Sequence, residues 1–484
     1  MTQTMTQIGM SRPDRPGPLS RRRFLATCSS SAACALCASL CAPRALTAQT
    51  AGAQTSPPPA GTARSEKARI RLVFSHPAPG IQGWPYVGYD FEGRKTEFTA
   101  RLRSGCPNIE FLPAPVPRTQ EDTTKILAAD SEVDGYVLYL LGLPSSPVGA
   151  ITASGRPVVV VNDLYGGGIG TMRGARVALV SSSDFNDVIQ AVRTYETIQR
   201  LRSSTLLDVV NRDPRDAKAI EEDFGTKIQT ISADDFNAAY AKADVAESDK
   251  WAKTWIRNAE KIVEPSEEEI GKSGRMYLAM RDLLTARGAQ GVAVDCLTLF
   301  YAGRMPAYPC LGFFQLNNDG LVGACEADLQ SAITMLAMTY LTGRPGYISD
   351  PVIDTSKNQI VYAHCVAPTK VFGPRGTANP YHIRSHSEDR KGASIRSLLP
   401  LGQVVTSLKF MPGQKTVVIH TAKTVANIDD DKACRTKVAA EIPNAQKMLE
   451  GWTQGWHRVT VYGDHRNRVT TLSALLGFKV VEEG

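Results

Sequence analysis

The chain has 484 residues, of which 43% are hydrophobic and 21% charged, and its formal net charge is +7 at pH 7. Residues 1–48 carry six arginines and one acid, so five of the seven charges lie there and the rest of the chain is nearly neutral. This balance excludes a strongly basic mature surface, so we expect neither nucleic acid nor an anionic membrane as a partner. The length predicts two or three domains.

The amino terminus resembles a twin-arginine export signal. Ser20-Arg-Arg-Arg-Phe-Leu25 precedes a weakly apolar run over 26–42 and then small residues. The pattern predicts a signal peptide at 1–48 and a Pro-rich flexible linker at 49–65. Because this route carries folded proteins, we expect a periplasmic or secreted protein that is free of the membrane once the signal is removed. A basic tail without a targeting role is the alternative.

The cysteines outside the predicted signal do not have the spacing of a zinc-binding motif. Four of the ten lie in the predicted signal, and the other six are scattered without a C-x-x-C pair: Cys106, Cys296, Cys310, Cys325, Cys365 and Cys434. Cys296, Cys325 and Cys365 lie in strand-like runs, which is typical of small core residues. A disulfide outside the cytoplasm stays open as an alternative.

Residues 66–172 predict an amino-terminal α/β domain. Strand-like runs alternate with helix-like stretches, which favours an open and mostly parallel sheet. The strands are expected at 70–74, 109–112, 133–141 and 157–161. The loop after the first strand is rich in aromatic residues, and we interpret its Trp84 as a candidate substrate-binding side chain, for its own or a neighbouring subunit's site. A plain ordered loop is the alternative.

Residues 173–355 predict a second α/β domain, which again has an open parallel (Rossmann-like) sheet. Its strands are expected at 176–181, 206–210, 227–231 and 291–296, with helices at 185–202, 215–224 and 267–287. Ser232 and Asp235 resemble a capping box that opens a further helical region. The last region, 356–484, contains short β-like runs at 359–365, 404–410 and 416–420. We expect a smaller, mainly β domain there, antiparallel or barrel-like.

Two acids flank one predicted helix. Asp328 can cap the amino end of a helix whose apolar residues recur at helical spacing, and Gly343 can end it. Apolar runs before and after this helix predict two parallel strands joined by a crossover. Glu326 and Asp350 would then share the carboxyl edge of one sheet, where they could bind a divalent cation or act as a base and acid pair. They could equally be a helix-start acid and a turn residue.

Two of the seven histidines have informative positions. His364 ends a predicted strand, at an edge comparable to that of Glu326. His457 opens another predicted strand, after Trp452 and Trp456. For each histidine, the alternative is an ordinary hydrogen-bonded core residue.

These residues together resemble the L-fucose isomerase and L-arabinose isomerase superfamily. The likeness is carried by Glu326-Ala-Asp328, the helix ending Leu341-Thr-Gly343, Asp350, and the segment from Gly455 to Asp464 with the closing run at 472–481. In motif it covers about 320–366 and 450–481. It implies that Glu326 and Asp350 are metal ligands that also transfer protons.

The resemblance also implies that His457 is a metal ligand and His364 an additional histidine beside the metal. Mn²⁺, or another divalent cation, suits carboxylate and imidazole ligands. Trp456 becomes a second candidate for binding substrate. The family further implies a homo-oligomer with a small-molecule sugar substrate.

The sequence therefore predicts an exported, metal-dependent aldose–ketose isomerase. Its substrate would be an open-chain aldopentose or 6-deoxyhexose, isomerised by proton transfer through an enediol. The alternative is an exported sugar-binding protein on the same scaffold that catalyses no reaction.

Overall fold

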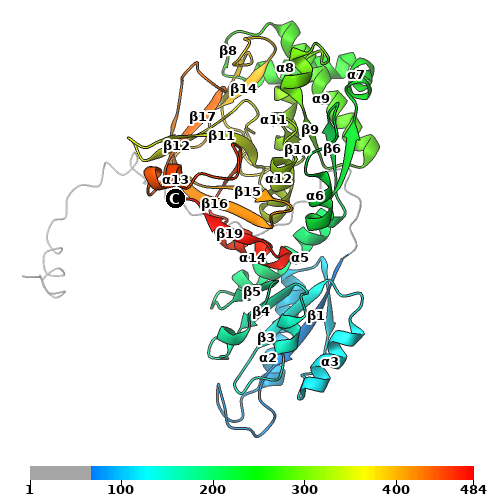
Figure 1. Cartoon of the computed structure of the whole chain (residues 1–484), viewed down its shortest axis with the longest axis vertical. Helices are drawn as coiled ribbons and strands as arrows, with labels where there is room; N and C mark the ends of the chain where they lie inside the picture. The colour runs from blue at the N-terminus through cyan, green and yellow to red at the C-terminus, as the bar shows by residue number, and fades with distance from the viewer. Residues whose placement is uncertain (1–66) are drawn as a thin grey trace, which may run out of the picture. The chain divides into compact units, whose positions relative to one another are not determined.

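The computed structural model describes residues 67–484 (Figure 1), so the predicted signal and linker lie outside the described residues. Within this range no helix combines the length and the hydropathy needed to cross a membrane. The fold contains parallel sheets with helices and an antiparallel barrel, which agrees with the predicted α/β class followed by a mainly β region.

The first sheet has five parallel strands in the order β2-β1-β3-β4-β5. The strands are β1 (Ala68–Ser75), β2 (Ile109–Pro113), β3 (Gly135–Leu140), β4 (Val158–Asn162) and β5 (Val177–Val180). β3 is a continuous apolar run buried along its whole length, as expected for a parallel strand covered on both faces. The parallel sheet predicted for this region is confirmed.

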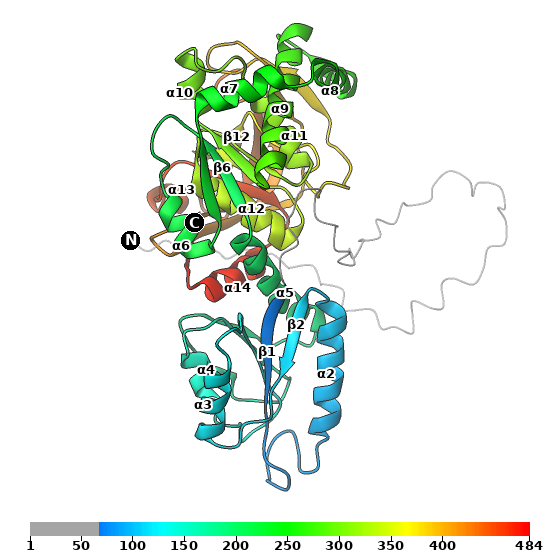
Figure 2. The same cartoon turned by 90° about the vertical axis from the view of Figure 1, so that its right-hand side faces the viewer.

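Helices cover both faces of this sheet (Figure 2). α2 (Phe91–Gly105) and α5 (Phe185–Arg202) pack on one face, and α3 (Gln120–Ala129) and α4 (Gly149–Ala153) on the other. One strand was assigned wrongly: the run at 176–181, expected in the second sheet, pairs with β4 as β5. The strand is short and carries no signal that tells one parallel sheet from the next.

The second sheet has four parallel strands in the order β10-β9-β6-β7. They are β6 (Thr205–Val209), β7 (Lys227–Ile231), β9 (Gly291–Val294) and β10 (Val322–Ala324), with helices α6 (Ala217–Phe224), α7 (Ala233–Lys242), α8 (Val245–Asn258), α9 (Glu267–Arg287), α10 (Cys296–Tyr301), α11 (Cys310–Asn318) and α12 (Leu329–Thr342). Ser232 accepts a hydrogen bond from the backbone N–H of Asp235 and caps α7, as predicted. The Asp235 side chain accepts from the Ser232 hydroxyl, so the reciprocal bond of a capping box is replaced by this contact. α10 and α11 were not predicted, because a Pro-rich stretch precedes α11.

The carboxyl-terminal region forms an antiparallel barrel. Six strands follow the order β15-β18-β11-β12-β17-β16, and β16 pairs with β15 to close the ring, while β19 adds to β16 in parallel. They are β11 (Tyr347–Asp354), β12 (Gln359–His364), β15 (Val404–Met411), β16 (Thr416–Asn427), β17 (Thr436–Glu441), β18 (Arg458–Tyr462) and β19 (Lys479–Glu482). The remaining elements are α13 (Ala445–Glu450), α14 (Arg466–Leu476) and a small sheet of β8 (Lys261–Ile262), β13 (Tyr381–Arg384) and β14 (Ser394–Ser397).

The predicted crossover around α12 is wrong. β10 lies in the second parallel sheet, whereas β11 is an antiparallel barrel strand between β12 and β18. Asp350 therefore lies within β11, opposite Ala363, and does not share a sheet edge with Glu326. A strand-helix-strand pattern cannot show that its two strands belong to different sheets.

Helix α12 joins these parts of the fold (Figure 1). It contacts β9 and β10 of the parallel sheet, β11, β15 and β18 of the barrel, and α5. Its apolar residues are buried on nearly every side, which explains why the segment is apolar beyond one helical face. The helix begins at its cap Asp328 and ends at Gly343, which has the left-handed φ of 71°, both as predicted.

We expect Leu336→Ala to lower the free energy of unfolding by about 2–5 kcal/mol, because truncating a buried leucine leaves a cavity. Leu336 is 1% exposed in α12. The matched control is Leu449→Ala in α13, where the leucine is 50% exposed, and its effect should stay below about 0.5 kcal/mol. Denaturant unfolding of both variants measures the difference, and equal effects would contradict this role of α12.

Candidate active site and metal centre

Glu326 follows β10 in a strained backbone conformation. Glu326 and Ala327 have φ angles of 60° and 48°, in the left-handed region that residues with a Cβ seldom adopt. The N–H of Ala327 donates to the carbonyl of Val294 in β9 at 2.9 Å, which holds the turn. Strain of this kind costs of order 1–3 kcal/mol and clusters at functional sites. It turns the chain sharply between the end of β10 and the start of α12.

Three elements bring Glu326, Asp350 and His457 together. His457 directly precedes β18, next to β11, which carries Asp350. Its Nε2 lies 3.1 Å from Asp350 Oδ1 and 3.5 Å from Glu326 Oε2. The three residues that the sequence proposed as metal ligands therefore converge, although the two acids come from different sheets.

His364 lies at the inner side of this cluster. It ends β12, is 2% exposed, and places Nε2 3.8 Å from Glu326 Oε1 and 4.0 Å from Asp350 Oδ2. Within residues 67–484 no hydrogen-bond partner reaches this nitrogen. Nδ1 accepts the backbone N–H of Cys365 at 2.9 Å, so the neutral ring carries its hydrogen on Nε2 in this geometry. Burial lowers the pKa of His364 to about 4, which keeps the ring neutral near pH 7.

Asp328 has a second role that the sequence did not reveal. Its carboxylate caps α12 by accepting the backbone N–H of Ser331 at 2.9 Å. The Oδ2 atom also lies 2.9 Å from His457 Nδ1 and accepts from Lys409 Nζ at 2.8 Å. A carboxylate on Nδ1 directs Nε2 of His457 at the other two acids, which is the usual arrangement behind a metal-binding histidine.

The two acids of the site have unequal surroundings. Asp350 accepts hydrogen bonds from Trp456 Nε1 at 2.8 Å and from Cys434 Sγ at 3.6 Å, besides its contact with His457. The carboxylate of Glu326 accepts no hydrogen bond within residues 67–484, and its side chain is 34% exposed. Asp350 is therefore held by hydrogen bonds, whereas the carboxylate of Glu326 faces the imidazoles of His364 and His457 at 3.8 and 3.5 Å.

The ionisation of the cluster follows from these contacts. Burial raises the pKa of Glu326 above its ordinary value. The positive charge of His457 lowers this pKa, and the negative charge of Asp350 raises it further. Burial would also raise the pKa of Asp350, but His364, His457 and Trp456 lower it overall. For His457 burial is outweighed by its bonds to Asp328 and Asp350, which raise its pKa to about 9.

The two tryptophans predicted to bind substrate lie in different places. Trp456 is at the cluster, 62% exposed, and its indole N–H binds Asp350. Trp84 lies in the loop after β1, bridges to Leu143 and is 56% exposed. Within residues 67–484, the hydrogen bonds of Trp84 join it to Leu143 and not to the cluster. Substrate binding by either residue stays a prediction.

The donor atoms suit a divalent cation. Ligand atoms of Asp350, His364 and His457 lie within 4.8 Å of one another, as do those of Cys325, Glu326 and His364. The unpartnered Nε2 of His364 adds a buried polar atom that a cation would satisfy, provided that the ring hydrogen moves to Nδ1. Carboxylate and imidazole donors match Mn²⁺ and related ions. The residues therefore fit the predicted divalent cation, and several ions would suit them equally.

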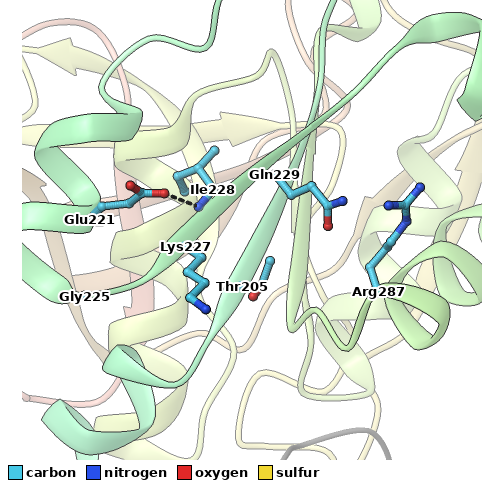
Figure 3. Close-up of a pocket in the computed structure, with 7 residues that line it drawn as sticks. All are labelled: Thr205, Glu221, Gly225, Lys227, Ile228, Gln229 and Arg287. Carbon is cyan, nitrogen blue, oxygen red and sulfur yellow. Dashed lines mark hydrogen bonds between the residues drawn. The ribbon is translucent and has the colours of Figure 1, made fainter.

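A cavity of about 540 Å³, shown in Figure 3, has none of the cluster residues in its lining. Its lining residues are Thr205, Glu221, Gly225, Lys227, Ile228, Gln229 and Arg287. Thr205 and Lys227 begin β6 and β7, so the cavity lies at the amino ends of these strands. Glu326 follows the carboxyl end of β10 in the same parallel sheet, which is the end where α/β proteins bind ligands. We therefore do not assign the active site to this cavity.

The known proteins to which this chain is similar in sequence share one name, sulfoquinovose isomerase. No family model matches the chain. The sulfoquinovose isomerase of Alkalicoccus urumqiensis is 21% identical over 304 residues, which cover 60% of this chain and 67% of that protein. The sulfoquinovose isomerase of Clostridium sp. (strain MSTE9) is 28% identical over 231 residues, 42% of this chain and 46% of that protein. That of Priestia aryabhattai is 29% identical over 130 residues, 26% and 28% of the two chains.

These similarities support an enzyme that isomerises a sugar. The chain spans two thirds of the first relative and less than half of the other two. Among solved structures, a carbohydrate transporter from Acidothermus cellulolyticus in complex with myo-inositol aligns at 13% identity with a TM-score of 0.16. The alignment covers 58% of this chain and 89% of that one.

In the metal-free protein we expect Asp328→Asn to lower the pKa of His457 from about 9. Asparagine keeps the helix cap but removes the negative charge beside Nδ1. Because the pKa of folded His457 lies above its ordinary value of 6.5, its stabilising contribution is complete below about pH 6.5 and is lost as the pH rises through 9. NMR shifts of the ring protons against pH measure the change.

The matched control for this variant is Asp244→Asn. Asp244 caps α8 by accepting the N–H of Glu247, and its substitution should leave the titration of His457 as it is. If Asp328→Asn also leaves that titration unchanged, the carboxylate does not hold the imidazole as the structure indicates.

Proposed function

We propose that the protein is a metal-dependent aldose–ketose isomerase that acts on an open-chain aldose. This proposal is supported above all by the contact of two acids with one imidazole. Asp350 Oδ1 lies 3.1 Å and Glu326 Oε2 lies 3.5 Å from Nε2 of His457. The similarity to sulfoquinovose isomerases supports the same class of reaction.

In this proposal Glu326 moves the proton. Its carboxylate is partly exposed and accepts no hydrogen bond within residues 67–484, so a lone pair is available to substrate. It would take the proton from C2 of the aldose and return it to C1 through an enediol, while the proton on O2 passes to O1. The turn at Glu326 and Ala327 brings the residue from the end of β10 to His457, and positioning of a base beside the substrate is a large part of the rate gain.

Glu326, Asp350 and His457 would hold the cation, with His364 as an additional donor beside them. Asp350 is kept anionic and fixed by Trp456 and Cys434, and His457 is oriented by Asp328. When bound, Mn²⁺ or a similar ion polarises the carbonyl oxygen of the sugar. Binding at Nε2 requires His457 to lose the proton that its acidic neighbours stabilise, so cation affinity should rise with pH.

The substrate is also part of the proposal. The superfamily resemblance favours an aldopentose or a 6-deoxyhexose, and the named relatives add sulfoquinovose. Trp456, exposed beside Asp350, offers an aromatic face to the sugar. In this proposal the protein is a homo-oligomer, and Trp84 of one subunit would contact the sugar bound by its neighbour. Sedimentation analysis can test whether the oligomer exists. The predicted export signal leads us to propose a periplasmic or secreted location.

We expect Glu326→Gln to reduce turnover by about 10²–10⁴-fold, because the amide cannot accept the C2 proton. The measurement is ketose formation and deuterium uptake at C1 or C2 in D₂O, with Mn²⁺ and a panel of aldopentoses, 6-deoxyhexoses and sulfoquinovose. Glu267→Gln, at the start of α9, is the control and should retain full activity.

The outcomes of this assay separate the two candidate functions. Sugar binding without ketose or deuterium in the wild-type protein would reject the isomerase and leave the exported sugar-binding protein. Unchanged turnover in Glu326→Gln would remove this residue from the mechanism.

We expect removal of the cation by a chelator to abolish turnover, and added Mn²⁺ to restore it, because the restrained acid and the imidazole are placed to hold an ion.

Asp350→Asn should weaken Mn²⁺ binding, measured by calorimetry, because it removes one charged donor. Full turnover by protein that elemental analysis shows to be metal-free would contradict metal dependence.

A further inference from the structure

Two buried thiols touch each other beside the proposed active site. Cys296 follows β9 and Cys325 follows β10, which are neighbouring parallel strands (Figure 1). Their Sγ atoms are 3.2 Å apart, and the residues are 1% and 5% exposed. We expected both as small core residues, and burial alone agrees with that role. Their position at the ligand-binding end of the parallel sheet suggests a further one.

Cys325 also lies within reach of the proposed active site. Ligand atoms of Cys325, Glu326 and His364 lie within 4.8 Å of one another. His364 Nε2 is one of the buried side-chain atoms without a hydrogen-bond partner among the described residues, and it lies 3.8 Å from Glu326. The three side chains thus bring one sulfur, one oxygen and one nitrogen donor close together.

We propose that Cys325, Glu326 and His364, with Cys296 beside them, form a second cation position that selects thiophilic ions such as Zn²⁺ and Cd²⁺. Thiolate is a soft donor that favours these ions over Mn²⁺, and a site with nitrogen and sulfur ligands binds Zn²⁺ more tightly than Mn²⁺. The partly exposed side of Glu326 gives an ion a way in.

Binding at this position has a defined proton balance. The Cys325 thiol releases its proton to solvent as the metal–sulfur bond forms. His364 offers Nε2 after its hydrogen moves to Nδ1, which gives up the contact with the Cys365 N–H. Cys296 stays within contact of Cys325 and can donate its S–H to the new thiolate or bind the ion as a second sulfur.

The second position overlaps the first. Glu326 and His364 belong to both sets of donors, so one ion excludes the other. This part of the inference rests on the proposed isomerase and predicts that Cd²⁺ inhibits turnover in competition with Mn²⁺. The binding of Cd²⁺ itself does not depend on any activity of the protein.

The test is a Cd²⁺ titration of the metal-free protein without residues 1–48, whose four cysteines would bind the ion themselves. It is done under a phosphine reductant and followed by the ultraviolet absorbance of the cadmium–thiolate bond. We expect the band to saturate at one equivalent in the wild-type protein and to be lost in Cys325→Ser. Cys106→Ser is the matched control: Cys106 is buried at the end of α2 in the first sheet region, and its substitution should leave the band unchanged.

Two further measurements test the second position even if Cys325→Ser does not fold. X-ray absorption at the cadmium edge of the wild-type protein should show sulfur together with lighter ligands, and Cys296→Ser should weaken the band. No band in the wild-type protein, or an equal band in folded Cys325→Ser, would overturn the second position. Failure of the isomerase alone would instead appear as Cd²⁺ binding without turnover in any metal.

Discussion

The carboxylate of Asp328 is the contact on which the arrangement of the site depends. It starts α12, binds Lys409 of β15 and holds the ring of His457 beside β18. A single anion thus ties the central helix to two strands of the barrel. Because Asp328 is two residues from Glu326, it also fixes the distance between the barrel imidazole and the acid at the end of the parallel sheet. This contact lets acids from two sheets act together.

Much of the fold could be predicted from the sequence because its signals are local. Continuous apolar runs showed the parallel strands, and cap residues such as Ser232 and Gly343 marked helix ends. The pairing of strands is a non-local property, so the same signals failed there. β5 joined the first sheet and β11 joined the barrel, against expectation. The convergence of Glu326 and Asp350 was predicted for a geometric reason that is wrong.

Several parts of the candidate site had no signal in the sequence. Asp328 could be recognised as a helix cap, but its bond to His457 joins residues far apart in the chain. Lys409 and Cys434 touch the acids only because β15 and the segment before β17 close the barrel around them. The unequal roles of Glu326 and Asp350 also required coordinates, since the difference lies in hydrogen bonds from Trp456 and Cys434.

The central claim is that one cation is held jointly by acids of the parallel sheet and the barrel. Anomalous X-ray diffraction from a crystal loaded with Mn²⁺ tests this most directly. The account predicts one strong peak bonded to Glu326, Asp350 and Nε2 of His457, with Asp328 still on Nδ1 of that ring. A peak bonded to other residues, with these side chains left without an ion, would contradict it.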